Sequence, residues 1–192
     1  MAKTVSQDGP VILVVGDSLS AGYGIEDGTG WVDLLQQRLD RAGHNYNIIN
    51  ASITGDTTSG GLTRLKLSLQ QFDPVLVIIE LGGNDGLRAI PLQVVESNID
   101  QMIEQSQAAG ARVALLGMRI PTNYGVRYTA QFHQIYKDAA KRHDVAFVEF
   151  FLDGVALNPD LMLPDGIHPN AAAQSVLLDN AWPAITEALD AL

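Results

Sequence analysis

The sequence predicts one three-layer α/β domain in which helices cover both faces of a five-stranded parallel sheet. The chain has 192 residues, a length that suits a single domain. Five short runs are apolar and rich in β-branched residues, without the alternation of strands that face water on one side. Between these runs lie segments with helical periodicity, so strands and helices alternate as in βαβ units.

The expected strands are the five apolar runs, Val11–Val15, Tyr46–Ile49, Val75–Ile79, Val113–Leu116 and Val145–Val148. Four helices are expected between them, because apolar residues recur at helical spacing over residues 31–42, 62–72, 92–103 and 132–139. A fifth helix is expected to begin near Ala171. Pro183 is expected to kink or split it, because proline lacks the N–H of the helical ladder. Residues 1–192 should therefore form one domain, with residues 1–9 as a flexible N-terminal extension.

The composition is that of a folded, acidic protein. Hydrophobic residues make up 46% and charged residues 18% of the chain, and the mean hydropathy of +0.08 excludes intrinsic disorder. The net charge of −10 repels nucleic-acid phosphates and anionic membrane surfaces, so nucleic acid is not an expected partner. The chain has no cysteine, which excludes disulfides, thiolate nucleophiles and cysteine-ligated metal centres.

Two cellular locations are consistent with the sequence. Residues 1–9 are polar and lack the apolar stretch of a signal peptide. No apolar run approaches the roughly 18 residues that a membrane span requires, so stable membrane insertion is not expected. The protein is therefore expected to be cytoplasmic, or a mature exported chain that carries an added methionine.

In parallel α/β sheets, ligands bind beyond the carboxyl ends of the strands, so the segments that follow the strands are the places to seek chemistry. After the first strand, Ser18 lies at a tight strand-to-helix turn, as a nucleophile or as a helix N-cap. After the second, Gly55 could offer its N–H to an oxyanion, or simply precede a capped helix start. After the third, the Asn84 amide could donate to the same oxyanion, or belong to an ordinary glycine-rich turn.

The last such segment, residues 164–170, combines an acid with a histidine. Asp165 and His168 are three residues apart in a turn rich in glycine and proline, so both side chains can face one side of a loop. A serine nucleophile needs a histidine base that a carboxylate orients. The other three histidines lie in a helix-to-strand connection, inside a helix and at a helix C-terminus, which favours His168 as that base. The alternative is a solvent-exposed capping pair before the last helix.

Metal and phosphate chemistry are not expected. Asp17, Asp165 and His168 are suitable metal ligands, but the chain has neither three clustered histidines nor a His-x-x-x-His pair. Neither a P-loop nor a dinucleotide fingerprint follows the first strand. A Gly-x-Ser-x-Gly elbow is also absent, which argues against the α/β-hydrolase fold.

Taken in order, four of these segments resemble the signature blocks of the SGNH hydrolases, also called the GDSL lipase/esterase family. The matching blocks are Gly16-Asp17-Ser18-Leu19, Gly55, Gly82-Gly83-Asn84-Asp85 and Asp165-x-x-His168. Each block alone is a weak signal, and four in order at the expected strand ends are a strong one. Further stretches at residues 17–24, 50–53, 81–88, 119–125 and 165–170 resemble the bacterial multifunctional thioesterase/protease/lysophospholipase and arylesterase subgroup.

The resemblance implies a flavodoxin-like fold and a serine hydrolase that needs no cofactor. Ser18 would attack the acyl carbonyl, His168 would act as base and then as acid, and Asp165 would orient the ring. The oxyanion hole would consist of the N–H groups of Ser18 and Gly55 and the side-chain amide of Asn84. Members of this subgroup are often exported to the periplasm, which favours the mature-chain interpretation of the N-terminus.

We therefore expect a monomeric serine hydrolase of the arylesterase, thioesterase or lysophospholipase type, acting on small acyl esters. Leu87, Ile90 and Ile120 lie in post-strand loops and could form the acyl-binding wall, with ordinary packing against a helix as the alternative. A carbohydrate O-acetylesterase is the second hypothesis, although the aromatic residues that stack on sugars make up only 6% of the chain. A non-catalytic ligand-binding domain is the third, and the intact set of candidate catalytic residues argues against it.

Overall fold

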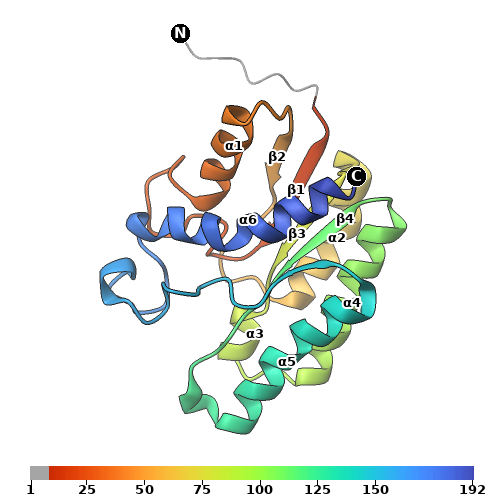
Figure 1. The fold of residues 1–192 in the computed structure, drawn as a ribbon. Coiled ribbons are helices and arrows are strands. Elements are labelled where there is room, and N and C mark those ends of the chain that lie inside the picture. The colour runs from red at the N-terminus through yellow and green to blue at the C-terminus, as the bar shows by residue number, and fades with distance from the viewer. Residues whose placement is uncertain (1–8) are drawn as a thin grey trace.

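The computed structural model describes residues 9–192, which contain one five-stranded sheet. All neighbouring strands are parallel, in the order β2-β1-β3-β4-β5 (Figure 1). The strands are β1 (Val11–Gly16), β2 (Asn47–Asn50), β3 (Leu76–Glu80), β4 (Arg112–Leu116) and β5 (Ala146–Val148). This is the flavodoxin-like order, whose switch point lies between β1 and β3. The predicted fold class is confirmed, and every strand boundary lies within one residue of its expected place.

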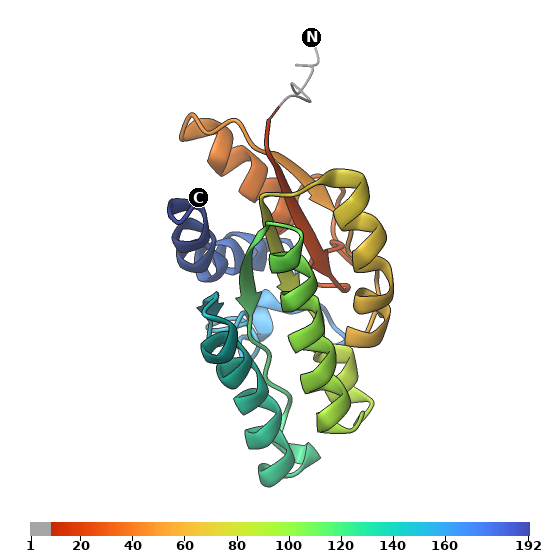
Figure 2. The same cartoon turned by 90° about the vertical axis from the view of Figure 1, so that its right-hand side faces the viewer.

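Helices cover both faces of the sheet. One face carries α1 (Trp31–Arg41) and α6 (Gln174–Asp190), and the other carries α2 (Thr58–Phe72), α4 (Leu92–Ala108) and α5 (Val126–His143). Figure 2 shows α1 and α2 on opposite sides of β1. The short helix α3 (Gly83–Leu87) follows β3 directly, and the loops contain the 3-10 helices η1 (Thr122–Tyr124), η2 (Pro159–Leu161) and η3 (Ala171–Ala173).

The central strands form the middle of the core. All of β3 and the stretch from Ile12 to Val15 in β1 are buried. Because helices cover both faces, these strands need no polar side, which explains why their sequences do not alternate. Trp31, the first residue of α1, is fully buried and packs edge-on against Phe151 with ring centroids 5.3 Å apart.

Three details differ from the sequence-based expectations. Helix α6 continues through Pro183, so the expected split is wrong. Its buried face, which includes Leu177, Ala181 and Ile185, packs on α1 and on three strands, and this packing offsets the hydrogen bond that proline cannot make. Helix α2 begins at Thr58, four residues before the first apolar position of the expected helix, and the Thr57 hydroxyl caps it by accepting from the Gly60 N–H, which confirms the alternative of a capped helix start after Gly55. The short α3 was not expected.

Residues 1–8, most of the expected N-terminal extension, lie outside the described residues. Within residues 9–192, no helix combines the length and the apolar character needed to cross a bilayer.

Candidate active site

Ser18 lies in the turn directly after β1, at the carboxyl edge of the sheet. Two backbone hydrogen bonds hold this turn, from Ala21 N–H to the Asp17 carbonyl (2.9 Å) and from Tyr23 N–H to the Ser18 carbonyl (3.1 Å). β1 borders the switch point of the strand order, and ligands bind at such points in open α/β sheets. The fold therefore places the serine where a substrate would approach.

The ring of His168 connects Ser18 to Asp165. His168 Nε2 lies 2.9 Å from Ser18 Oγ, and His168 Nδ1 lies 2.7 Å from Asp165 Oδ2. Both separations are hydrogen-bond distances. The structure thus brings together three side chains that the sequence patterns singled out, two of them 150 residues apart.

Asp165 is held and charged by its own turn. Its Oδ1 accepts from the N–H groups of His168 (3.0 Å) and Ile167 (2.9 Å). These bonds, led by the one from the His168 backbone, together with the imidazole contact lower the pKa of Asp165 from 3.8 to about 2. A charged Asp165 requires the ring proton on Nδ1, which leaves Nε2 able to accept the proton of Ser18.

Two other histidines also contact carboxylates. His133 Nε2 lies 3.2 Å from Glu149, and His143 Nε2 lies 2.8 Å from Asp100. Within residues 9–192, only His168 also has a ring nitrogen at hydrogen-bond distance from a serine hydroxyl. A nearby carboxylate therefore does not by itself distinguish a candidate base in this chain, and the contact to serine does.

Asn84 is carried to the site by α3. The preceding Gly82 has a φ of +113°, and a Cβ there would collide with the Tyr136 hydroxyl, which donates to the Leu81 carbonyl at 2.9 Å. Glycine is thus required at this junction. Asn84 Nδ2 donates to Asp17 Oδ2 at 2.9 Å, and a second N–H of the same amide remains for a ligand.

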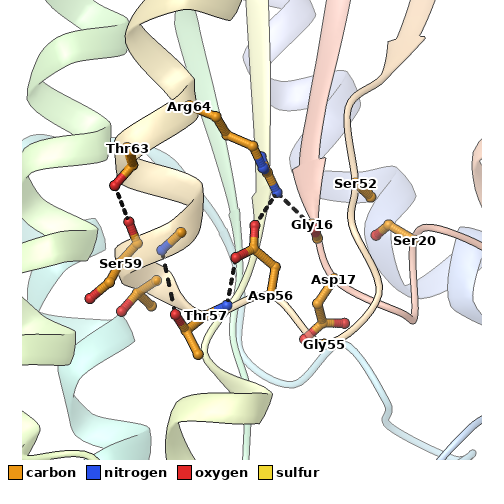
Figure 3. A network of polar contacts seen from close by, with 12 residues as sticks. Gly16, Asp17, Ser20, Ser52, Gly55, Asp56, Thr57, Ser59, Thr63 and Arg64 are labelled. Atoms are coloured by element: carbon orange, nitrogen blue, oxygen red, sulfur yellow. Dashed lines mark hydrogen bonds and ion pairs between the residues drawn. The ribbon is translucent and has the colours of Figure 1, made fainter.

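Gly55 lies between β2 and α2, directly before Asp56, which forms an ion pair with Arg64 (Figure 3). Its φ is +80°, and its carbonyl accepts from Arg88 Nη2 at 3.0 Å. Among the described residues, the backbone N–H groups of Gly55 and Ser18 have no hydrogen-bond acceptor. Both are therefore donors that a bound oxyanion could use.

Two buried carboxyl groups lie at the ends of β1 and β3. Asp17 is 2% exposed and Glu80 is fully buried. Burial raises the pKa of Asp17 from 3.8 to about 6 and holds the pKa of Glu80 well above 4.5. Ser20 donates to Glu80 Oε2 at 2.5 Å, and Trp31 Nε1 donates to Ser20 Oγ at 3.2 Å. This chain of hydrogen bonds connects the turn of Ser18 and Ser20 to α1.

No group of three or more histidine or acidic side chains within residues 9–192 is arranged to hold a metal ion.

Comparison with known proteins decides the family. The model of the GDSL-like Lipase/Acylhydrolase family matches residues 14–176. The chain belongs to this family.

Esterase TesA of Pseudomonas aeruginosa is 48% identical, over 91% of this chain and 87% of its own length. Thioesterase 1/protease 1/lysophospholipase L1 of Escherichia coli is 44% identical, over 90% of this chain and 81% of its own. A crystal structure of TesA covers 92% of this chain and 98% of its own, with a TM-score of 0.90 and 47% identity.

The predicted family and the predicted class of enzyme, an ester hydrolase, are thereby confirmed. In this GDSL acylhydrolase, Tyr23 also lies at the candidate site, although the sequence patterns did not identify it. Its ring centroid lies 4.4 Å from that of His168, with the planes tilted by 41°, and the residue is half-exposed. Glu80 was also missed, although an acid that ends an otherwise apolar strand is a signal that could have found it.

The three residues expected to form the acyl-binding wall of this acylhydrolase have different surroundings. Ile120 is buried in the core against Gly86, where a Cβ would collide with it. Ile90 is half-buried and also packs on the core. Leu87 is half-buried at the end of α3, and its carbonyl accepts from the Tyr124 hydroxyl at 3.2 Å. Ordinary packing accounts for Ile120, and contact of these side chains with an acyl chain stays a prediction.

Proposed function

We propose that this ester hydrolase cleaves carboxylic acyl esters and thioesters with Ser18 as its nucleophile. The observation that carries the proposal is the continuous contact from Asp165 through His168 to Ser18 Oγ, at 2.7 and 2.9 Å. Ser18 Oγ attacks the carbonyl carbon while His168 Nε2 takes its proton, and the carbonyl oxygen becomes an anion. His168 gives this proton to the leaving alcohol or thiol as the C–O or C–S bond breaks, which leaves an acyl-enzyme. A water that His168 deprotonates then attacks the acyl group, releases the acid and restores Ser18.

Three donors would stabilise the oxyanion. They are the N–H groups of Ser18 and Gly55, which have no acceptor within residues 9–192, and the second N–H of the Asn84 amide. One such donor typically lowers the barrier by about 3 kcal/mol. The charged Asp165 supports the same transition state, because it stabilises the imidazolium that His168 becomes.

We further propose that the enzyme acts in the periplasm, as a monomer. The proposed location rests on the resemblance to the bacterial thioesterase and arylesterase subgroup, whose members are often exported. The cytoplasm is the alternative location. The monomer is supported by the site itself, because the triad and all three oxyanion donors come from one chain. Osmotic-shock fractionation with a cytoplasmic marker tests the location, and size-exclusion chromatography with light scattering tests the assembly.

Hydrolysis of p-nitrophenyl esters of increasing acyl length tests the reaction. Ser18→Ala should lower kcat by at least about 10⁴-fold, because triad members act as a unit. Ser97→Ala, which changes an exposed serine of α4, is the matched control and should keep full activity. A fluorophosphonate should label Ser18, as shown by peptide mapping.

Each contrary result has a distinct meaning. Equal turnover by wild type and Ser18→Ala would show that the nucleophile lies elsewhere. A wild-type protein that neither turns over any ester nor takes the fluorophosphonate would favour the ligand-binding alternative. Faster hydrolysis of acetylated sugars than of aryl esters would favour the O-acetylesterase.

A further inference from the structure

We infer that Arg64 is a positioning residue of the oxyanion hole, which ties the loop of Gly55 to the end of the strand that carries Ser18. This inference rests on the proposed function, because it concerns two of the donors that the function requires. Arg64 belongs to α2 and is two turns of helix away from the Thr57 cap. Its hydrogen bond goes to Gly16 and its ion pair to Asp56, and it makes no polar contact with Ser18 or His168 among the described residues, so we expect its effect on catalysis to pass through the backbone.

One nitrogen of Arg64 makes both contacts. Arg64 Nη2 donates to the Gly16 carbonyl at 3.0 Å and lies 2.7 Å from Asp56 Oδ2 (Figure 3). Gly16 is the last residue of β1 and stands two residues before Ser18, whereas Asp56 directly follows Gly55. A single guanidinium group therefore spans the two segments whose N–H groups are to bind the oxyanion.

The partners of Arg64 are themselves held in place. The Gly16 carbonyl also accepts from the Ile53 N–H at 3.1 Å, so the β2–α2 loop meets the end of β1 at this one oxygen. Asp56 Oδ1 accepts from the Thr57 N–H at 2.9 Å, and a Cβ at Gly60 would collide with this carboxylate. The position of Asp56 is thus set by α2, and the ion pair transmits it to β1.

The ion pair is poorly exposed. The side chains of Arg64 and Asp56 are 19% and 13% exposed, which weakens screening by water. By comparison, Arg38 and Asp179 form a 2.6 Å ion pair between α1 and α6 with side chains 32% and 65% exposed. The two pairs have the same chemistry, and only the first joins segments that carry oxyanion donors.

Loss of the Arg64 contacts with Gly16 and Asp56 should impair the chemical step more than substrate binding. The oxyanion forms only as the serine attacks, so donors that are displaced cost transition-state stabilisation and leave the ground-state complex nearly unchanged. Displacement of catalytic groups by about 1 Å costs on the order of 100-fold in rate. We therefore expect Arg64→Met to lower kcat between about 10- and 100-fold, with KM changed less than about threefold.

The test compares Arg64→Met, Arg64→Lys and Arg38→Met in p-nitrophenyl ester hydrolysis. Arg64→Lys keeps the charge and one nitrogen that can donate to two acceptors, so it should restore part of kcat. Arg38→Met removes the ion pair between α1 and α6, which joins no segment with an oxyanion donor, and should leave kcat unchanged. The double variant Arg64→Met/Asp56→Asn removes both charges, so no uncompensated buried charge remains to unfold the protein. It should be no slower than Arg64→Met.

A second substrate distinguishes a displaced oxyanion hole from a general loss of structure in the variant. In a thionoester, sulfur replaces the carbonyl oxygen and accepts hydrogen bonds poorly, so an intact oxyanion hole favours the oxygen ester. Arg64→Met should narrow the ratio of ester to thionoester turnover at least about threefold, and Arg38→Met should not. A kcat of Arg64→Met equal to wild type, or an unchanged ratio in the folded double variant, would overturn the inference. Absence of Ser18-dependent turnover in the wild type would instead overturn the proposed function.

Discussion

Two regions around Ser18 treat their carboxyl groups in opposite ways. In the turn of residues 163–170, the Asp165 side chain is 37% exposed and its pKa is lowered to about 2. At the ends of β1 and β3, Asp17 and Glu80 are buried and their pKa values are raised, that of Asp17 to about 6. The same chemical group is thus kept charged in one region and pushed toward its neutral form in the other.

The difference in pKa lies first in burial, which is the largest cause of the raised values of Asp17 and Glu80, and then in the hydrogen bonds that each carboxyl group accepts. Asp165 accepts from two backbone N–H groups and from the imidazole ring while solvent still reaches it. Glu80 Oε2 accepts from Ser20, but Glu80 Oε1 is buried without a partner among the described residues. A catalytic role that needs a permanent negative charge suits the first region, and a role in holding the backbone suits the second.

Among changes to these carboxyl groups, the largest expected effect comes from removing the charge of Asp165. Asp165→Asn should lower kcat about 10³- to 10⁴-fold, because an amide cannot stabilise the imidazolium and favours the wrong ring tautomer. Asp160→Asn, an exposed acid in the neighbouring η2, is the control. Steady-state kinetics on a p-nitrophenyl ester measure both, and a loss below about tenfold for Asp165→Asn would contradict the assignment.

The buried region should show its effect in stability. Glu80→Ala leaves a cavity and removes the acceptor of Ser20, so we expect it to lower the free energy of unfolding by about 2–4 kcal/mol. Glu80→Gln keeps the shape of a neutral carboxyl group and should cost about 1 kcal/mol or less. Urea denaturation at pH 7 measures both variants. Equal losses for alanine and glutamine would mean that Glu80 contributes as a charge.

The third expected effect is a change of the unfolding free energy with pH, caused by the titration of Asp17. Because its pKa is raised from 3.8 to about 6, its contribution to stability is fully present below pH 3.8 and is lost as the pH rises through 6. Asp17→Asn cannot titrate, so the difference in unfolding free energy between wild type and variant should shift by roughly 2 kcal/mol across this window. Urea denaturation at several pH values from 4 to 7 measures it, with the exposed Asp153→Asn as control. Parallel curves for wild type and Asp17→Asn would refute the raised pKa.

The opposite sign is expected for Asp165. Its pKa is lowered from 3.8 to about 2, so its contribution is present above pH 3.8 and disappears as the pH falls through 2. The two regions therefore respond in opposite directions to acidification, and in different pH windows.

The smallest expected effect concerns the ring beside the base. Tyr23→Ala removes the aromatic face next to His168, which should lower kcat/KM about three- to tenfold through poorer packing of the imidazole and weaker stabilisation of its cation. Tyr23→Phe keeps the ring and should stay within about twofold of wild type. Steady-state kinetics between pH 5 and 9 measure both. If Tyr23→Phe lowered kcat/KM as much as Tyr23→Ala, the contribution of Tyr23 would come from its hydroxyl and not from its ring.

Much of the fold was predictable because burial on both faces makes parallel strands easy to recognise. The candidate triad was predictable because Asp165 and His168 share one short turn and Ser18 lies in the turn directly after a strand. Arg64 and Tyr23 were not identified, since their importance depends on contacts between distant segments that no local pattern reveals. Glu80 was missed although its place at the end of an apolar strand is visible in the sequence. Pro183 was misjudged for the same reason, because the packing of α6 is tertiary.

The 150-residue separation between Ser18 and His168 has a consequence for biosynthesis. Chains grow from the N-terminus, so the strand that carries Ser18 leaves the ribosome long before the turn that carries its base. A translation product that ends between residues 18 and 165 contains Ser18, the proposed nucleophile, without Asp165 and His168, which are proposed to activate it. The proposed mechanism therefore predicts that such fragments have no esterase activity, and that activity appears only once synthesis has passed β5 and reached His168.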